Sequence, residues 1–480
     1  MMKPESAKER FALGQQKRKQ MKRLEHKGWK VKQRRESPLK LLEEGTRGRV
    51  PSLVGLKNQL MAASPFGYFR GAVPVMAYDL SLVGNTGIYN QLCGDAHVRN
   101  LGAFAGADGR LQFDINDFDE TIVAPFEWDV KRMATSLILA GRGAGAKDGR
   151  CGEVAAVFLE RYRTSMEAFA GMPVLELARF QVHRLGNVAP VAGILKMAER
   201  ATPVHTLLAL TKVERSEEEG KSAGLAKKAG AKKAAASREP MTRKAAAKAE
   251  AKQVTKGERV FRTQAPMLTR VTGAMADRVV NSLTTYGESL QPERRHFLAQ
   301  YRPVDVAFKV VGTGSVGLRD YVVYLDGNGP RDPLFLQIKE ETASGYAPYV
   351  KSFGGSKRAV SKQHNGRRVV DGERAMQVQS DPFLGWTTME GRDYLVRQLN
   401  DHKASIQLED MKSLELMEYA AVCGELLARG HARAGDAAMI AGYLGTSTRF
   451  DEAISAFASA YADQTEMDWK QLVHSLKKGK

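Results

Sequence analysis

Apolar residues recur at helical spacing in two separate parts of the chain. Between Trp128 and Ala140 they follow one helical face, and Pro125 just ahead is a typical helix start. Helical spacing continues toward residue 212, occurs with breaks at proline and glycine in residues 62–80, and returns from Leu414 to Ala432. The pattern predicts two helix-rich stretches, one early and one at the carboxyl end.

The third quarter of the chain has a different pattern. Short runs rich in Val, Tyr, Phe and Ile alternate there with Gly, Asp and Pro turns, which is typical of strands. An earlier strand is expected after the Asp108-Gly109 turn, and one helix is predicted at Glu373–Gln379. The predicted strands are Leu111–Phe113, Val304–Val311, Tyr321–Leu325, Leu334–Ile338 and Tyr394–Leu399.

These elements divide the chain into segments of different character. Residues 1–48 are rich in Lys, Arg and Gln, so we expect a basic flexible arm. Residues 213–258 are dominated by Ala and Lys and offer nothing to bury, so we expect a disordered linker. For the other segments, the pattern predicts a helical lobe at 49–212, a β-rich lobe at 259–400 and carboxyl-terminal helices at 401–480 that complete the helical lobe. The expected fold class is α+β.

The formal net charge of +19 is concentrated in two of these segments. Residues 1–50 hold 16 Lys and Arg against 6 Asp and Glu, and residues 221–256 hold 11 against 2. The rest of the chain is therefore formally neutral. Because a folded nucleic-acid reader normally carries its basic patch on the folded domain, we expect only weak polyanion contact, through the arm and the linker.

Cysteine usage and hydropathy bear on the compartment. The three cysteines, Cys93, Cys151 and Cys423, are far apart and outside any CxxC spacing, which argues against a disulfide framework or a zinc knuckle. The amino terminus is charged, and no run approaches the ~20 apolar residues of a membrane span. We expect a protein of the reducing cytoplasm without membrane contact.

The first candidate site combines carboxylates with an amide. Gly94-Asp95-Ala96-His97-Val98-Arg99-Asn100 places an Asp five positions before an Asn, and Asp114 follows the short strand. Phosphoryl transfer needs this set, because one carboxylate orients or accepts the proton of the attacking hydroxyl while another carboxylate and an amide oxygen hold Mg²⁺. The alternative is a polar turn followed by an acidic loop.

The second candidate site is Gly312-Thr313-Gly314-Ser315-Val316-Gly317. A dinucleotide fold needs a helix after such glycines, whereas two predicted strands follow here and the second ends in Lys339. Glycines let backbone N–H groups close over phosphates, and a lysine two strands on reaches the α/β-phosphates in protein kinases. Glu373 is the candidate partner of Lys339, although Glu340 and Glu341 are nearer in sequence. The alternative for Lys339 is an ordinary solvated position at a strand end.

The two candidate sites complement each other, but their order is reversed. Protein kinases run from glycine loop to lysine to catalytic and metal-binding Asp, whereas here residues 95–119 precede residues 312–339. The helix Leu414–Ala432, which in kinases leads into the catalytic loop, lies at the carboxyl end. A circular permutation accounts for these placements, because a site depends on spatial arrangement rather than chain order. The sequence thus predicts a bilobal, circularly permuted kinase-like fold.

The chain also resembles a bacterial family, the domain of unknown function 2252, which is grouped with protein-kinase-like folds. The resemblance spans about residues 50–470, and its strings lie at Ser64–Gly71, Gly94–Asn100, Phe113–Thr121, Glu127–Arg132 and Tyr461–Thr465. Within kinase-like folds the second string is most similar to the His-Gly-Asp-Leu-His-x-Gly-Asn loop of aminoglycoside and choline phosphotransferases. Gly94, Asp95, His97 and Asn100 fall on matching positions.

This resemblance implies a role for several residues. Asp95 is implied as the catalytic base and Asn100 as a metal ligand, with Asp114 as the metal-binding Asp, Asp117 as its rival and Asp119 as a third option. Asp129 resembles the buried Asp that braces the catalytic loop, and His97 is expected to support that loop by a hydrogen bond. Cys93 stands where those enzymes have a loop His. Arg70 is expected to face phosphate or substrate, or to pair with the acidic loop.

The expected function is ATP- and Mg²⁺-dependent phosphoryl transfer to an unidentified small-molecule or protein hydroxyl, with the acceptor pocket formed between residues 141 and 300. One alternative is a metal-dependent phosphohydrolase, in which Asp95, His97, Asp114, Asp117 and Asp119 furnish a two-metal site and the glycine loop is dispensable. A second alternative is a nucleotide-binding pseudokinase or interaction module whose basic arm contacts an acidic partner. A third is the transfer of a nucleotidyl or other non-phosphoryl group from ATP.

Overall fold

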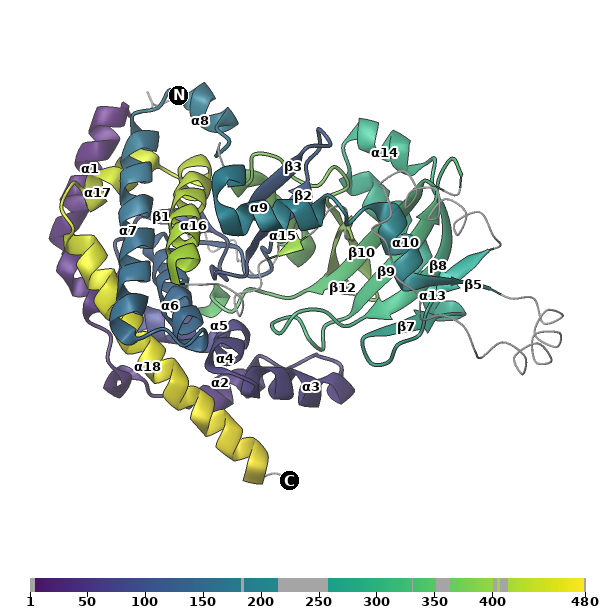
Figure 1. Cartoon of the computed structure of the whole chain (residues 1–480), viewed down its shortest axis with the longest axis horizontal. Coiled ribbons are helices and arrows are strands. Elements are labelled where there is room, and N and C mark those ends of the chain that lie inside the picture. Colours follow the sequence, from purple (N-terminus) through teal and green to yellow (C-terminus); the bar gives the residue numbers. More distant parts are fainter. Residues whose placement is uncertain are drawn as a thin grey trace, which may run out of the picture.

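The computed structural model describes residues 5–182, 185–214, 258–329, 331–350, 363–399, 404–405 and 413–478. Long helices form one side of the molecule and a six-stranded antiparallel sheet forms the other (Figure 1). The α+β fold class is therefore confirmed. Within the described ranges, no helix combines the length and the apolar character needed to cross a bilayer.

Helices from the first half and from the carboxyl end pack into one layer. α6 (Glu127–Gly143) is buried over almost its whole length, and α7 (Asp148–Ala170) and α18 (Arg449–Lys478) pack against it. α16 (Ser413–Ala434) lies along α7, so the helices predicted at Trp128–Ala140 and Leu414–Ala432 are confirmed. Shorter helices flank this layer: α8 (Val174–Arg179), η3 (Leu185–Asn187), α9 (Ala189–Ala198) and α17 (Ala437–Leu444). α10 (Pro203–Leu210) instead packs on the sheet side, against β10 (Pro333–Glu341).

Three short helices lie below α6 in Figure 1 and pack with the helical side of the molecule. They are α3 (Pro51–Ala62), α4 (Pro65–Gly71) and α5 (Val73–Ser81), and each has a proline in its first turn, where the missing N–H costs nothing. Ser64 Oγ accepts a hydrogen bond of 2.9 Å from the Gly67 N–H and so caps α4. The helices and turns predicted for residues 62–80 are present.

The basic segment at the amino terminus is not a flexible arm. Its described residues form α1 (Ala7–Gln20), η1 (Arg23–Lys27), η2 (Val31–Gln33) and α2 (Pro38–Glu44), and α1 packs on α17. Arg18 Nε donates to Tyr443 O at 2.9 Å, and Arg23 Nη1 donates to Leu444 O at 2.6 Å. These carbonyls lie at the end of α17, where a helix lacks its own donors. Arg18 and Arg23 are thus used in intramolecular contacts. Composition alone cannot show such contacts, and for that reason it predicted a flexible arm.

The large sheet has the strand order β11-β12-β10-β9-β8-β7. Its central strand, β10, is buried at every position and places Lys339 opposite Asp320 and Leu395. Four of its strands were predicted from the sequence and are confirmed with small shifts of their ends. The strands are β7 (Leu268–Val271), β8 (Arg302–Lys309), β9 (Asp320–Asp326), β10 (Pro333–Glu341), β11 (Gly385–Met389) and β12 (Arg392–Gln398).

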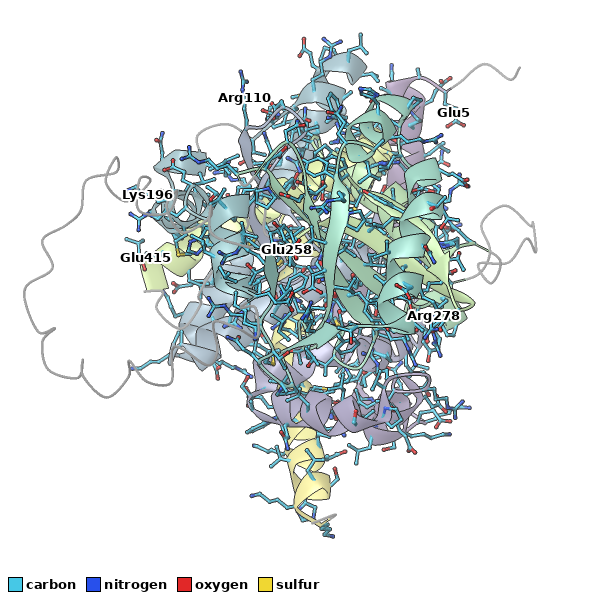
Figure 2. All side chains as sticks on the ribbon, turned by 90° about the vertical axis from the view of Figure 1, so that its right-hand side faces the viewer. Glu5, Arg110, Lys196, Glu258, Arg278 and Glu415 are labelled. Atoms are coloured by element: carbon cyan, nitrogen blue, oxygen red, sulfur yellow. The ribbon has the colours of Figure 1, made fainter. Side chains whose placement is uncertain are left out.

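Three helices lie beside this sheet: α13 (Ala274–Ser289), α14 (Pro292–Leu298) and α15 (Asn365–Met376). α13 buries Val279 and Tyr286, while Arg278 projects from its outer face, as Figure 2 shows. The helix predicted at Glu373–Gln379 is the end of α15, which begins earlier because the His364 side chain accepts from the Arg367 N–H at 3.1 Å.

Smaller sheets position the acidic segment. β1 (Tyr89–Leu92) pairs with β4 (Ile122–Pro125), β2 (Leu101–Ala105) pairs with the predicted strand β3 (Leu111–Ile115), and β13 (Ala404–Ser405) adds to β2. β5 (Thr211–Val213) pairs with β6 (Arg259–Phe261), which brings the two ends of the predicted linker together. Of that linker, residues 215–257 lie outside the described residues.

The packing of α1 on α17 gives a prediction for stability. A Cβ at Gly14 would lie 2.0 Å from Met439 O, a backbone atom that has little room to move. Gly14→Ala should therefore lower the free energy of unfolding, by roughly 1–3 kcal/mol as is typical of overpacking. Gly152→Ala, in α7 with nothing within 4 Å of its Cβ, is the matched control and should be neutral or slightly stabilising. Urea unfolding of both variants checks this, and equal stabilities would contradict the packing of α1.

Candidate functional site

The loop between β1 and β2 carries Asp95 and is held in place by Asp129 of α6. Asp129 accepts hydrogen bonds from the Cys93 N–H at 2.9 Å and the Gly94 N–H at 3.1 Å. Gly94 has a φ of 83°, and a Cβ there would lie 2.1 Å from Glu120 O, so only glycine fits. The expected bracing role of Asp129 is confirmed by these contacts.

His431 of α16 supports the same brace and was missed by the sequence analysis. Its Nε2 lies 3.3 Å from Asp129 Oδ2, and its Nδ1 lies 2.8 Å from the Tyr162 hydroxyl oxygen. A histidine therefore supports this loop from α16, although Cys93 stands where the similar phosphotransferases have a histidine in the loop itself. No local signal could have identified His431, because it lies 302 positions after Asp129.

Asp95 is held by a buried arginine. Arg132 Nε donates to Asp95 Oδ1 at 2.7 Å, and His97 Nε2 lies 3.5 Å from Asp95 Oδ2. Burial alone would raise the pKa of Asp95, but Arg132 and His97 lower it below its ordinary value, so the carboxylate is ionised at neutral pH. His97 Nδ1 also accepts from the Arg99 N–H at 3.2 Å, which agrees with the expected support of the loop.

Asn100 ties this loop to the acidic segment. Its Nδ2 donates to the backbone oxygens of Asp95, at 2.8 Å, and Asp117, at 3.0 Å. The side chain is 3% exposed. Asn100 and Asp117 are therefore neighbours, as a shared metal site would require.

Asp114 lies apart from this group, and its expected role as metal ligand needs correction. Its carboxylate forms an ion pair with Arg429 of α16 and accepts from the Ile115 N–H at 2.8 Å. Burial raises the pKa of Asp114 although Arg429 lowers it. Because Asp114 projects from β3 toward α16, the rivals that follow the strand, Asp117 and Asp119, are the carboxylates in the site.

Asp117 and Asp119 meet Lys339 of β10. The Lys339 ammonium forms an ion pair with Asp119 and lies 3.9 Å from Asp117 Oδ1. Burial and the charge of Asp119 raise the pKa of Asp117 to about 6, whereas Lys339 lowers the pKa of Asp119 against the effect of burial. Among the described residues, neither Asp117 Oδ1 nor Asp119 Oδ1 has a hydrogen-bond partner.

The expected pairing of Lys339 with Glu373 is not formed. Glu373 of α15 is buried beside Arg397, and with Asp117 it raises the pKa of Arg397, which burial lowers. Another residue of α15, Arg368, was missed: it donates to Asp119 O and Thr342 O, both at 2.8 Å. α15 therefore fixes the backbone of the acidic segment against the end of β10.

The glycine segment connects β8 to β9, and basic residues from the amino-terminal side hold it. Gly312 and Gly317 have φ values of 56° and 93°, which favour glycine. Lys57 Nζ donates to Thr313 O at 3.2 Å and Gly314 O at 3.1 Å, and Arg49 Nη1 donates to Val316 O at 2.6 Å. Burial lowers the pKa of Lys57 to about 7. The Ser315 hydroxyl donates to Asp119 Oδ2 at 2.9 Å and links the two candidate sites directly.

Both candidate sites line one cavity of 280 Å³. Three of its cations, Arg49, Lys57 and Arg70, come from α3, α4 and the turn before them. The structure thus brings together two segments that are about two hundred positions apart. The predicted residues on its wall are Arg70, Asp95, His97, Asp117, Asp119, Gly312, Gly314, Ser315 and Glu341.

The carboxylates of this cavity do not form a multi-ligand metal cage. Within the described part of the chain, no three His, Cys, Asp or Glu side chains are arranged to hold a metal ion on their own. The pair Asp117 and Asp119 nevertheless has two buried oxygens without a hydrogen-bond partner, and Mg²⁺ is commonly held by one or two carboxylates together with phosphates and water. The residues present fit a nucleotide-bound Mg²⁺ better than a protein-only cage.

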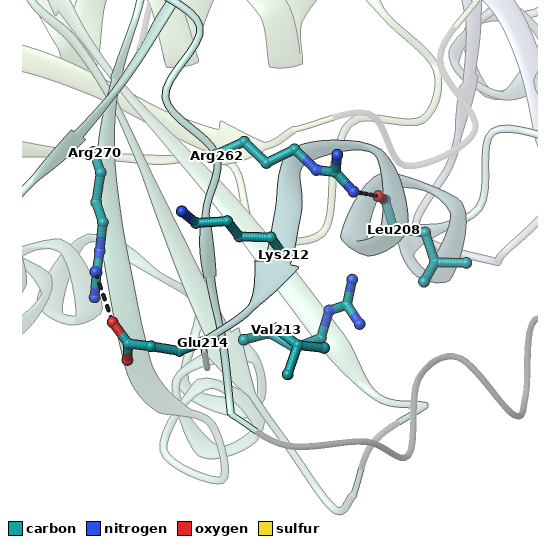
Figure 3. Close-up of a pocket in the computed structure, with 7 residues that line it drawn as sticks. Leu208, Lys212, Val213, Glu214, Arg262 and Arg270 are labelled. Carbon is teal, nitrogen blue, oxygen red and sulfur yellow. Dashed lines mark hydrogen bonds and ion pairs between the residues drawn. The ribbon is translucent and has the colours of Figure 1, made fainter. Parts of the chain in front are cut away.

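A larger cavity of 780 Å³ lies elsewhere, at the β5–β6 pair (Figure 3). Its wall is basic, with Lys212, Arg259, Arg262 and Arg270 against Glu214, which pairs with Arg270 at 3.0 Å. Arg262 turns toward the backbone of Leu208 (Figure 3). No residue of this wall lines the cavity with Asp95 and Asp119.

Comparison with known proteins gives one finding. A family model described as "Uncharacterized protein conserved in bacteria (DUF2252)" matches residues 49–475. No curated protein and no solved structure matches the chain. The match covers almost all elements described above, from α3 to α18, and includes both candidate sites.

The raised pKa of Asp117 gives a prediction for pH dependence. A carboxyl group with a higher pKa in the folded chain holds its proton more tightly there, so stability falls as pH rises from the ordinary value of 3.8 through about 6. Asp117→Asn removes this loss of stability, so the variant should have a higher Tm than the parent at about pH 7.5. The difference in Tm should become smaller toward about pH 4. Thermal unfolding in metal-free buffers measures the difference. Asp108→Asn on the surface is the matched control, and a pH-independent difference for Asp117→Asn would contradict the prediction.

Proposed function

The chain belongs to the DUF2252 family, and we propose that it is a kinase-like phosphotransferase that uses Mg·ATP to phosphorylate a hydroxyl group. One observation supports this proposal above all: the glycine segment, Asp95 and the pair of Asp117 and Asp119 line one cavity, with Lys339 bonded to Asp119. Positioning and charge stabilisation are what phosphoryl transfer requires of a protein.

The arrangement of elements supports a circularly permuted, bilobal kinase-like fold. β8, the glycine segment, β9, β10 with Lys339, α15, β11 and β12 follow each other in the order of a kinase nucleotide-binding lobe. The loop with Asp95 and the acidic segment come earlier in the chain, and α16 follows β12. Asp129 holds the backbone of the catalytic loop from a buried helix, which is the role expected for such a fold.

The proposed nucleotide site combines backbone donors with side-chain cations. Gly312 and Gly314 line the cavity, and nothing lies within 4 Å of a Cβ at Gly312, which leaves room for phosphate next to the loop backbone. Gly317 instead packs against the Arg49 side chain. Lys339 is buried behind the cavity wall, where it forms an ion pair with Asp119, a residue of that wall. We propose that it pairs with phosphate oxygens when nucleotide binds. Arg49 and Lys57 hold the loop by its carbonyl oxygens.

The proposed metal ligands are Asp117, Asp119 and the amide oxygen of Asn100. Asn100 is fixed by its nitrogen to the backbone of Asp95 and Asp117, which keeps its amide at the site. A bound Mg²⁺ would neutralise charge on the phosphates and orient them. It would also relieve the repulsion between two carboxylates of which one has a pKa of about 6.

Asp95 is proposed to orient the attacking hydroxyl and to take its proton. Its strong bond to Arg132 makes it a weak base, so orientation is its larger contribution, in agreement with a loose transition state in which the proton leaves late. His97 and Arg132 fix the carboxylate from both sides. The three cysteines are buried and unpaired, which supports the proposed cytoplasmic location.

Nucleotide binding is the first prediction of this function. Mg·ATP should raise the Tm of the chain and bind saturably, and Lys339→Ala should weaken binding at least about tenfold, which corresponds to ~1.4 kcal/mol. Isothermal titration calorimetry measures both. Lys212→Ala, in the remote cavity of Figure 3, is the matched control and should bind like the parent. An unchanged Tm with Mg·ATP would remove the basis of the proposal.

The second prediction separates transfer from binding. Asp95→Asn should keep Mg·ATP affinity but lose at least about a hundredfold in phosphoryl transfer, the usual scale for a lost acid–base group. Mass spectrometry of ADP and of phosphorylated products from a bacterial metabolite and protein extract gives the readout. Tight binding without any product in the parent would identify a pseudokinase. Phosphate release without nucleotide, retained in Lys339→Ala, would identify a phosphohydrolase instead.

A further inference from the structure

A third cavity, of 540 Å³, adjoins the cavity that contains Asp95. It lies between the α3–α4 corner and the end of α6, and the two cavities share Arg70 on their walls. Thr313, at the tip of the glycine segment, also faces it. Its volume is in the range of sites for small organic molecules. The residues on its wall include Leu60, Pro65, Phe66, Arg70, Arg99, Leu139, Ala140, Arg142, Thr313 and Glu466.

This cavity reaches close to the proposed catalytic carboxylate. The ring of Phe66, on its wall, packs edge-on against His97 with a centroid distance of 6.0 Å. His97 in turn lies 3.5 Å from Asp95 Oδ2. Phe66 and His97 therefore lie between this cavity and Asp95, and Arg70 lies on the walls of both cavities.

The wall of the cavity is apolar with a surplus of positive charge. Leu60, Phe66 and Leu139 offer an apolar surface, while three arginines and one carboxylate supply the charges. That carboxylate, Glu466, is already paired with Arg142 at 3.0 Å. The carboxylate on this wall is thus already neutralised by Arg142, so the wall does not favour a cationic ligand.

Arg70 is the arginine of this wall that is best placed to bind an anionic ligand. Among the described residues it forms no ion pair, its Nε has no hydrogen-bond partner, and its Nη1 lies 3.5 Å from Thr313 Oγ1. The nearby carboxylate Asp95 is taken by Arg132. A half-buried guanidinium without an anion is costly, and a bound anion would offset that cost with charge-assisted hydrogen bonds.

We propose that this third cavity binds the acceptor, and that the acceptor is a small hydroxyl compound with an apolar body and an anionic group, carboxylate or phosphate, held by Arg70. The proposal rests on the phosphotransferase function given above and specifies its substrate class. The acceptor hydroxyl oxygen forms a bond to the γ-phosphorus while the bond from that phosphorus to the bridging oxygen breaks. ADP leaves with the electron pair, and the hydroxyl proton passes through Asp95 to water.

Probes that share one body and differ in charge test this substrate class. para-Hydroxyphenylacetate, the phosphate monoester of tyrosol, tyrosol itself and tyramine carry a carboxylate, a phosphate, no charge and an ammonium group on the same hydroxyphenyl frame. With Mg and a non-hydrolysable ATP analogue present, at least one anionic probe should bind at least tenfold more tightly than tyramine by ligand-observed NMR. Which anionic probe binds distinguishes a carboxylate from a phosphate ligand.

Variants locate this preference in the third cavity. Arg70→Met should reduce the preference for the anionic probe to less than threefold. Leu60→Trp narrows the exposed mouth of the cavity and should weaken the binding of all four probes, which gives a second test if Arg70→Met does not fold. Arg262→Met in the remote basic cavity is the matched control and should behave as the parent. Equal or tighter binding of tyramine, an unchanged preference in Arg70→Met, or no probe binding up to ten millimolar would overturn the inference. Mg·ATP binding is measured on the same samples. If the acceptor inference alone fails, Mg·ATP still binds; if the proposed function fails, nucleotide binding is lost as well.

Discussion

A buried ammonium group needs a nearby anion, and Lys339 on the central strand finds it in Asp119. This ion pair joins the large sheet to the acidic segment that follows β3, and the rest of the site is arranged around it. Ser315 adds the glycine segment by a hydrogen bond to the same carboxylate, and Arg368 holds the backbone on the other side. Asp117 is left with a raised pKa and an oxygen without a hydrogen-bond partner among the described residues, which favours a cation at that point.

The basic amino-terminal side of the chain also serves this site. Arg49 and Lys57 bind carbonyl oxygens of the glycine segment, and Arg70 separates the cavity with Asp95 from the cavity proposed for the acceptor. Further back, Arg18 and Arg23 bind the end of α17. Several cations of the amino-terminal side, among them Arg18, Arg23 and Arg49, therefore serve the fold itself by donating to backbone oxygens that need donors.

The loop that carries Asp95 shows how a site can be independent of chain order. Its backbone is held by Asp129 from α6, and Asp129 is in turn contacted by His431 from α16, near the other end of the chain. Asn100 connects the same loop to Asp117. Because each contact acts across space between packed helices and loops, the loop can come before the glycine segment without losing any support.

The sequence alone determined the elements whose signals are local. The strands β8, β9, β10 and β12, the helices α6 and α16, and the glycine turn follow from the spacing of apolar residues and from backbone freedom at glycine. The convergence of the two candidate sites was predicted because their chemistry is complementary. Tertiary structure decided which carboxylate lies next to Lys339. Asp114 was expected as a metal ligand from its position after a strand, but Arg429, 315 positions away, binds it, whereas Lys339 pairs with Asp119. The roles of Arg49, Lys57, Arg368 and His431 were likewise decided by distant partners, because a buried charge or carbonyl oxygen is satisfied by whatever packing brings near it and not by its neighbours in sequence.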